Sequence, residues 1–204
     1  CIRDRKNPEA YDLYLRGTAI SRDPAPNKTA IPILERSVEL DPNYAPAWLA
    51  LGERQYYDGT YSDGGLRAIE RSRTAAERAL ALDPALVTAR RRLIILATEG
   101  GELEAAWDQA SELLRRRHDA GESHFDAANV HRYGGLLEEA ARECQAAREI
   151  DPKNYQWRSC TIVFQQLRQF DRAKEYISLD GNSEWASFQT VSYTHLRAHE
   201  TEAD

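Results

Sequence analysis

Residues 37–52, SVELDPNYAPAWLALG, contain the local pattern from which the helix arrangement follows. The segment is typical of the end of one helix, a stop, and the start of the next helix. Pro42 ends the first helix, because proline has no N–H to donate and clashes with the preceding turn. From Trp48 onward, Trp48, Leu51 and Gly52 keep the i, i+3, i+4 spacing of one helix face.

The same junction returns twice along the chain. Residues 80–84 read LALDP, and residues 148–152 read REIDP. Small residues that suit helix crossings recur with separations of 42, 34, 34 and 33 residues, at Ala30, Ser72, Ala106, Ala140 and Ala173. A two-helix junction that recurs at a nearly fixed interval indicates an array of helical repeats.

Composition and charge exclude several classes of protein. The 204 residues are 42% hydrophobic and 29% charged, which provides enough apolar material for a packed core beneath a well-solvated surface. The formal net charge of −6 argues against general nucleic-acid affinity. The sequence has no apolar run of about 18 residues, so it predicts no membrane insertion.

Both ends of the sequence give expectations about the natural chain. Methionine is absent, at position 1 as elsewhere, so we expect the natural chain to begin upstream. Residues 191–201, VSYTHLRAHET, resemble the in-frame translation of a transposase adapter used in sequencing libraries. We therefore leave 191–204 out of the fold as an adapter-derived tail, and expect the natural chain to continue differently after about Thr190.

No motif of a catalytic or metal site is present. Phosphate-binding, dinucleotide-binding, zinc-protease and nucleophile-elbow motifs are all missing, so we predict no enzymatic activity, no cofactor and no metal. Cys1, Cys144 and Cys160 lack paired spacing, and we expect free thiols, the latter two buried, in a reducing, cytoplasmic compartment. We interpret His124 and His131 as ordinary surface or packed histidines.

A period of 34 residues with two helices in each unit resembles the tetratricopeptide repeat. The resemblance covers about residues 8–190. It implies an all-α fold, a right-handed superhelical solenoid of stacked antiparallel helix pairs, with about five repeats and a truncated sixth. The implied units follow an N-terminal edge at 1–7 and are about 8–42, 43–84, 85–118, 119–152, 153–180 and a partial 181–190.

Prolines and glycines set the expected helix ends. Asn7 before Pro8 suits a helix N-cap. The two prolines of residues 23–27 predict a loop, and we expect Pro32 in the first turn of the following helix. Three glycines predict a loop or frayed helix end in residues 56–65, where the second unit carries eight extra residues.

The tetratricopeptide resemblance implies a concave groove lined by the first helix of each unit. It further implies a noncatalytic scaffold that binds a peptide or a segment of a protein partner there. The groove positions carried over one by one are Asp12, Arg16, Leu49, Glu53, Tyr56, Tyr57, Arg91, Ile95, Thr98, Phe125, Asn129, Arg132, Tyr133, Arg158, Ile162, Gln165 and Gln166. Leu49 and Glu53 stand where relatives that clamp a C-terminal carboxylate have lysine and asparagine, which argues against binding of chaperone tails.

Two other hypotheses stay open. Residues 7–17, NPEAYDLYLRG, resemble the segment that opens repeat arrays in bacterial multidomain regulators. The chain would then be the interaction arm of a kinase, cyclase or winged-helix protein whose active domain lies upstream. Alternatively, the arginine runs at 90–92 and 115–117 would bind RNA or an acidic ligand. Consecutive helical residues point in different directions, however, which disfavours one basic patch.

The implied groove gives a first testable prediction. The double substitution Tyr57→Ala with Arg132→Ala is expected to weaken partner binding and to leave helicity intact, because both side chains would contact the partner rather than the core. Binding assays and circular dichroism measure the two effects separately. Equal losses of helicity and binding would show that both residues are structural.

Overall fold

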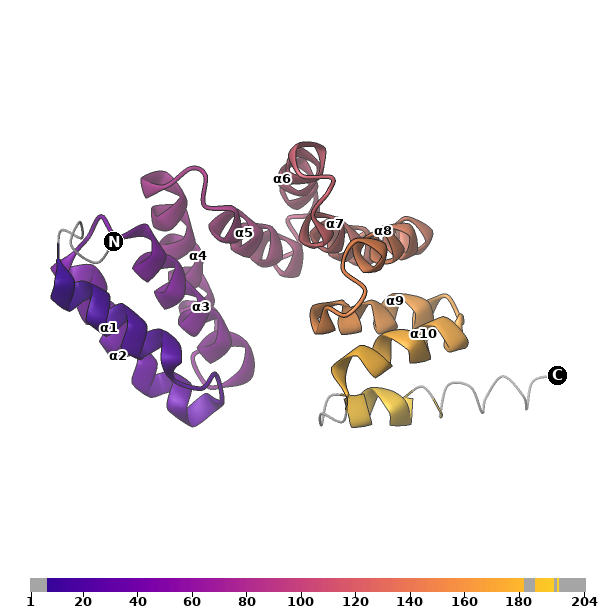
Figure 1. Cartoon of the computed structure of the whole chain (residues 1–204). Coiled ribbons are helices and arrows are strands. Elements are labelled where there is room, and N and C mark those ends of the chain that lie inside the picture. The colour runs from indigo at the N-terminus through magenta and orange to yellow at the C-terminus, as the bar shows by residue number, and fades with distance from the viewer. Residues whose placement is uncertain (1–6, 182–185, 193, 195–204) are drawn as a thin grey trace. The chain divides into compact units, whose positions relative to one another are not determined.

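The computed structural model describes residues 7–181, 186–192 and 194, which form helices and turns without any β-strand (Figure 1). The chain divides into two compact units, 1–96 and 97–204, and the division falls within α5 (Val87–Glu99). Within each unit, successive helices pack against one another as antiparallel pairs. The all-α fold of stacked helix pairs that the sequence predicts is thereby confirmed.

The first unit contains two complete helix pairs. Helix α1 (Pro8–Ala19) pairs with α2 (Pro24–Leu40), α3 (Ala45–Tyr61) pairs with α4 (Gly65–Leu82), and α5 follows. Helix α3 also contacts α2, so the two pairs stack in chain order (Figure 1). Contacts between sequence neighbours are the characteristic packing of repeat proteins.

Polar residues cap the helices where the sequence places them. Asn7 caps α1 as predicted, because its side chain accepts a hydrogen bond from the Ala10 N–H at 3.1 Å. Asp41 ends α2, and its carboxylate accepts a hydrogen bond from the Asn43 N–H at 3.1 Å. Asp83 ends α4 in the same way, because its carboxylate accepts a hydrogen bond from the Ala85 N–H at 3.0 Å. The Asp-Pro junctions are therefore helix stops.

Two expectations about the prolines of α2 are wrong. Pro24 and Pro26 lie in the first turn of α2, so the break between α1 and α2 is confined to residues 20–23. Proline is tolerated there, since the first N–H groups of a helix have no intrahelical partner. Pro32 lies inside the helix rather than in its first turn. Pro32 and Lys28 are both exposed, so water can reach the Lys28 carbonyl that loses its helical partner.

The tyrosine-rich residues 56–61 are helical, whereas the sequence predicted a loop or a frayed helix end over residues 56–65. Helix α3 continues through Tyr61, and a turn of three residues leads to α4. The Tyr57 ring packs against the Tyr56 and Tyr61 rings, with centroids 5.8 and 5.6 Å away. A Cβ at Gly59 would lie 2.7 Å from Ile69 Cδ1, so this glycine permits close packing of α4. The extra residues of the second unit thus lengthen two helices.

The second unit repeats the same arrangement with shorter helices at its end. In chain order it contains α6 (Leu103–Arg116), α7 (Gly121–Tyr133), α8 (Leu137–Ile150), the 3-10 helix η2 (Tyr155–Cys160), α9 (Thr161–Gln166), α10 (Phe170–Ile177) and the 3-10 helix η3 (Ser178–Asp180). Helix α6 contacts α7, α7 pairs with α8, and α9 pairs with α10. A further helical segment covers 186–192.

The small residues predicted at helix crossings are buried without exception. No surface is exposed at any of the five, namely Ala30, Ser72, Ala106, Ala140 and Ala173. Ser72 also donates a hydrogen bond to the Gly52 carbonyl at 2.7 Å, which links α4 to α3. A Cβ at Gly52 would lie 3.1 Å from the Ser72 carbonyl oxygen, so these two helices meet almost backbone to backbone.

A disulfide in the second unit corrects the expectation of free thiols. Cys144 of α8 and Cys160 of η2 are joined with an S–S distance of 2.04 Å. Both are buried in a core cluster that includes Trp157, Phe164 and Tyr176. The two cysteines are 16 residues apart and form no recognisable motif, so only the packing of η2 against α8 brings them together.

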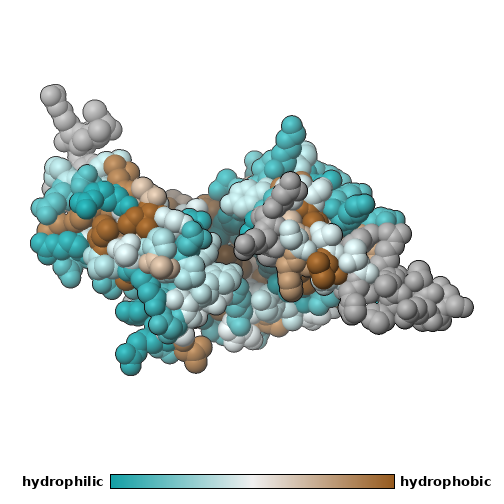
Figure 2. Space-filling model, turned by 90° about the horizontal axis from the view of Figure 1, so that it is seen from below, coloured by the Kyte–Doolittle hydropathy of each residue, from teal (hydrophilic) through white to brown (hydrophobic). Residues whose placement is uncertain are grey.

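The surface agrees with the high content of charged residues. On the face drawn in Figure 2, hydrophobic residues form separate small patches among hydrophilic ones. None of the described helices is both long and apolar enough to cross a membrane. Residues 1–6, 182–185 at the start of the expected sixth repeat, and 193 and 195–204 of the adapter-like tail lie outside the described residues.

Ala106 tests the assignment of the helix crossings. Ala106→Trp is expected to lower the melting temperature sharply, because overpacking a filled crossing costs about 1–3 kcal/mol or more. Ala105→Trp is the matched control, since Ala105 is exposed on the same helix and should tolerate the indole. Melting followed by circular dichroism compares the two variants. Equal melting curves for both would show that Ala106 is not at a crossing.

Candidate functional site

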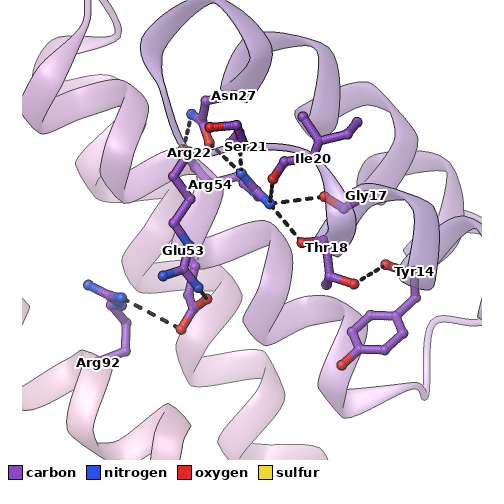
Figure 3. Close-up of polar contacts among 10 residues, drawn as sticks. All are labelled: Tyr14, Gly17, Thr18, Ile20, Ser21, Arg22, Asn27, Glu53, Arg54 and Arg92. Atoms are coloured by element: carbon purple, nitrogen blue, oxygen red, sulfur yellow. Dashed lines mark hydrogen bonds and ion pairs between the residues drawn. The ribbon is translucent and has the colours of Figure 1, made fainter. Parts of the chain in front are cut away.

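The candidate functional site is a group of arginines and tyrosines around one carboxylate in the first unit. We name Arg22, Glu53, Tyr56, Tyr57 and Arg92 the Glu53 cluster. Arg22 lies in the turn between α1 and α2, Arg92 lies on α5, and the other three lie on α3. Segments far apart in the sequence therefore meet at this point (Figure 3).

Glu53 lies between the two arginines. Its Oε2 accepts a hydrogen bond from Arg22 Nη2 at 3.3 Å, and its Oε1 lies 3.7 Å from Arg92 Nη2 (Figure 3). Strong charge-assisted hydrogen bonds are about 2.7–2.9 Å long, so both contacts are loose. Two guanidinium groups share one carboxylate, which leaves the Glu53 cluster with one net positive charge in an acidic chain.

Tyrosine rings hold the arginines in place. The Arg92 guanidinium carbon lies 4.4 Å from the centroid of the Tyr56 ring, and that of Arg22 lies 5.4 Å from the Tyr57 centroid. Such cation–π contacts contribute about 0.5–2 kcal/mol, with the larger values at desolvated sites. The two arginines are thus oriented by aromatic faces as well as by Glu53.

The two arginines differ in how far solvent reaches them. The Arg22 side chain is 54% exposed, that of Glu53 31%, and that of Arg92 only 11%. The Nε of Arg92 is buried and has no hydrogen-bond partner among the described residues. Arg92 is therefore a fixed charge beneath the surface, and Arg22 is the side chain that can reach another molecule.

Buried Arg54 positions the turn that carries Arg22. Its guanidinium donates hydrogen bonds to Asn27 Oδ1 and to backbone carbonyls at the end of α1 and in the following turn (Figure 3). The acceptor distances are 3.3 Å to Asn27 and 3.1, 3.2, 2.6 and 2.9 Å to the carbonyls of Gly17, Thr18, Ile20 and Ser21. A helix end leaves such carbonyls without intrahelical partners, and Arg54 supplies the missing donors.

Asn27 completes the link between α2 and α3. Its Nδ2 donates a hydrogen bond to the Arg54 carbonyl at 2.9 Å, so the two residues exchange hydrogen bonds. Burial, with the positive charge of Arg22 as a second cause, lowers the pKa of the Arg54 guanidinium below its ordinary value. Arginine nevertheless stays charged in proteins, and the acceptors around Arg54 compensate for its burial.

The sequence-predicted positions on α1, α3 and α5 vary in exposure. Asp12 and Arg16 are exposed and form a pair at 3.9 Å. Leu49 is buried against Ala79 and Ala89, and therefore offers little surface to a partner. Two of the three positions on α5, Arg91 and Ile95, are partly buried, whereas the third, Thr98, is buried.

The predicted positions of the second unit mostly contact their own neighbours. Phe125 packs on Trp157, the Asn129 amide donates to the Phe125 carbonyl, and the Arg132 guanidinium lies over the Tyr133 ring. Arg158 pairs with Asp180 at 2.7 Å. The last three positions are Ile162 and Gln165, which are partly buried, and Gln166, which is exposed.

Sequence reasoning missed Arg22 and Arg54, and it noticed Arg92 only as part of an arginine run. Neither Arg22 nor Arg54 belongs to a motif, and no periodic signal marks them. The repeat resemblance does point to Glu53, which is next to Arg54 in the sequence. However, its partners Arg22 and Arg92 are 31 and 39 residues away from it in the sequence. Only the packing of α1, α3 and α5 reveals the cluster.

The histidines and a surface cavity beside α8 and α10 show no comparable arrangement. His124 contacts Glu143 at 2.6 Å, and His131 packs on Trp107 with ring centroids 4.4 Å apart. Burial lowers the pKa of His131. No group of three potential metal ligands is found among the described residues. In a cavity of about 460 Å³ beside α8 and α10, Arg148 and Arg172 are engaged by neighbouring side chains.

The role of Arg54 is tested by Arg54→Met, which keeps the apolar stem and removes the donors. We expect the free energy of unfolding to fall by about 2–5 kcal/mol, because several buried carbonyls lose their partners. Arg36→Met is the control, since Arg36 is exposed and pairs with the exposed Glu39 on the same helix, and should change stability by less than about 0.5 kcal/mol. Urea denaturation measures both. Equal stabilities for the two variants would contradict this role.

Comparison with solved structures identifies the fold. MamA 41-end from Desulfovibrio magneticus RS-1 superposes with a TM-score of 0.59 at 12% identity, over 96% of this chain and 98% of that chain. TTC0263, a thermophilic TPR protein of Thermus thermophilus, gives a TM-score of 0.67 at 15% identity, over 93% of this chain and 95% of that chain. No family model matches the sequence, and no curated protein matches it. The chain therefore has a tetratricopeptide-like helical-repeat fold.

Proposed function

We propose that the chain is a noncatalytic interaction module whose first unit binds an acidic segment of a protein partner at the Glu53 cluster. The observation that carries this proposal is the pair of arginines, held over tyrosine rings, that share a single carboxylate. Arginine and tyrosine, together with tryptophan, are enriched among the residues that contribute most of the binding energy at protein interfaces. The tetratricopeptide-like fold supports a scaffold role by analogy only.

Charge favours a partner that supplies carboxylates. The exposed Arg16 is paired with Asp12, so the uncompensated positive charge of this region lies at Arg22 and Arg92. The guanidinium of Arg22 can turn toward a partner carboxylate and bind it through two parallel hydrogen bonds. Arg92 stays beneath it as a fixed positive charge, so the complex does not require a large rearrangement.

Glu53 would compete with the partner for the same guanidinium groups. Because its contacts with Arg22 and Arg92 are loose, a partner carboxylate with better geometry would replace part of its interaction with Arg22. Removing the charge of Glu53 should therefore strengthen the binding of an acidic segment. This gain distinguishes a binding site from an arrangement that only stabilises the fold.

Contacts of the arginine runs favour an acidic protein segment over RNA. Arg115 and Arg116 both pair with Glu112, and Arg92 lies against Tyr56. Arginines of both runs are therefore engaged by side chains of their own unit, which leaves fewer of them to contact a phosphate backbone. The other groove positions carried over from the repeat resemblance, in both units, remain a prediction.

A labelled peptide of alternating glutamate and tyrosine, titrated by fluorescence anisotropy, tests the proposal. Wild-type protein is expected to bind it, Arg22→Ala to weaken binding about tenfold, and Glu53→Gln to strengthen it, because charge-assisted hydrogen bonds contribute about 1.5–3 kcal/mol. Arg36→Ala on α2 is the matched control and should bind as wild type does.

Two further probes separate the alternatives. A peptide with glutamine in place of each glutamate should bind weakly, and equal affinity for both peptides would overturn the acidic specificity. Single-stranded RNA that binds more tightly than the acidic peptide, with a steep dependence on salt, would support the RNA hypothesis instead. Weaker rather than stronger binding by Glu53→Gln would show that Glu53 is not a competitor.

A further inference from the structure

The core of the second unit contains a covalent bond that the proposed function does not use. Cys144, near the middle of α8, and Cys160, the last residue of η2, are 1% and 2% exposed. Their disulfide joins the pair formed by α7 and α8 to the following helices. In a repeat array, where each pair contacts only its neighbours, such a bond crosses the boundary between two successive pairs.

Aromatic side chains enclose this disulfide. Trp157 and Phe164 have no exposed surface, and Tyr176 is 2% exposed. Trp157 Nε1 donates to the Asp151 carbonyl at 2.8 Å, and the Tyr176 hydroxyl donates to the Cys144 carbonyl at 3.0 Å. These hydrogen bonds fix the rings in place around the sulfur atoms.

The outer faces of these rings are covered in turn. The guanidinium of Arg148 lies 5.0 Å from the Tyr176 ring centroid, and that of Arg172 lies 4.3 Å from the Phe164 centroid. On the α7 side, a Cβ at Gly121 would lie 2.9 Å from Trp157 Cζ2. A thiolate must reach a sulfur atom to reduce a disulfide, and in the folded protein these layers block its approach.

The cross-link lies where the helices are shortest. Helices α7 and α8 have 13 and 14 residues, whereas α9 and α10 have 6 and 8, and η2 is a 3-10 helix. Helices this short are not stable by themselves in water, so their order depends on packing. The disulfide attaches η2, which leads directly into α9, to the longer helix α8.

We propose that the Cys144–Cys160 disulfide is a permanent structural cross-link, formed while the second unit folds in an oxidising compartment, and not a redox switch of the folded protein. Its burial argues against repeated reduction, and its position explains how a pair of short helices stays ordered. Compartments kept reducing by glutathione and thioredoxin do not maintain such bonds. The cytoplasmic location expected from the sequence would then be wrong.

The bond forms by two thiol–disulfide exchanges. One cysteine thiolate attacks the disulfide of an oxidant, either glutathione disulfide or an oxidised dithiol protein, and releases one oxidant thiolate. The second cysteine thiolate then displaces the other oxidant thiolate and closes the Cys144–Cys160 bond. The two cysteine thiols lose two electrons and two protons in total, and the oxidant disulfide becomes two thiols. Because both sulfur atoms are buried afterwards, these steps precede closure of the core.

Counting thiols tests whether the bond forms. Protein refolded with reduced and oxidised glutathione is denatured without reductant, alkylated with iodoacetamide and analysed by mass spectrometry. We expect one alkylated cysteine, Cys1, and a linked peptide pair that contains Cys144 and Cys160. Three alkylated cysteines in most molecules would overturn the cross-link.

Reduction kinetics test whether the bond is permanent. Dithiothreitol is expected to reduce the disulfide at least about 100-fold more slowly in native buffer than in concentrated urea, because the folded core excludes the reductant. Similar rates in the two conditions would show an accessible disulfide and would support a switch. The same protein serves for both measurements, so no variant has to fold.

A double variant tests the structural role. Cys144→Ala with Cys160→Ala is expected to melt about 10–20 °C below the wild type, the shift predicted for a closed loop of this length, and to be insensitive to dithiothreitol. Cys1→Ala is the matched control and should melt as the wild type does. A double variant as stable as the wild type would overturn the structural role.

Discussion

Paired helices can approach closely only where the crossing residue is small, and this constraint governs both units. Ala30 and Ala140 have no exposed surface, and Gly52 meets the backbone of Ser72 so closely that even a Cβ would be crowded. Gly59 allows a second close contact between α3 and α4, against Ile69. Because the crossings are filled, a larger side chain at any of them would have to displace a helix.

The candidate site depends on this packing through one buried guanidinium. Burying a charge costs several kcal/mol unless hydrogen bonds compensate for it, and Arg54 obtains that compensation from the end of α1, from the following turn and from Asn27. Those hydrogen bonds fix the turn that carries Arg22 beside Glu53. The fold thus presents a loosely held, partly exposed ion pair on a rigid support, which suits exchange with a partner carboxylate.

The second unit needs a different kind of stabilisation, because its last helices are short. Its last helices are too short to be stable alone, and the disulfide between α8 and η2 ties them to a longer pair. Closing a loop of this length contributes about 3 kcal/mol. The aromatic core around the bond therefore combines a covalent and a hydrophobic contribution, whereas the first unit relies on hydrophobic packing and the hydrogen bonds of Arg54.

Local signals in the sequence predicted the helix pairs, the Asp-Pro stops, the cap at Asn7 and the small crossing residues, because each depends on neighbours within a few turns of helix. They misplaced Pro32 and predicted a loop or a frayed helix end over residues 56–65. Helix α3 instead continues to Tyr61, because contacts of Tyr57 and Gly59 with other side chains outweigh the preference of glycine for turns. The acceptors of Arg54 lie 27 to 37 residues away, and the bonded cysteines are 16 apart. Such partners meet only after the helices have packed, so the tertiary structure alone revealed them.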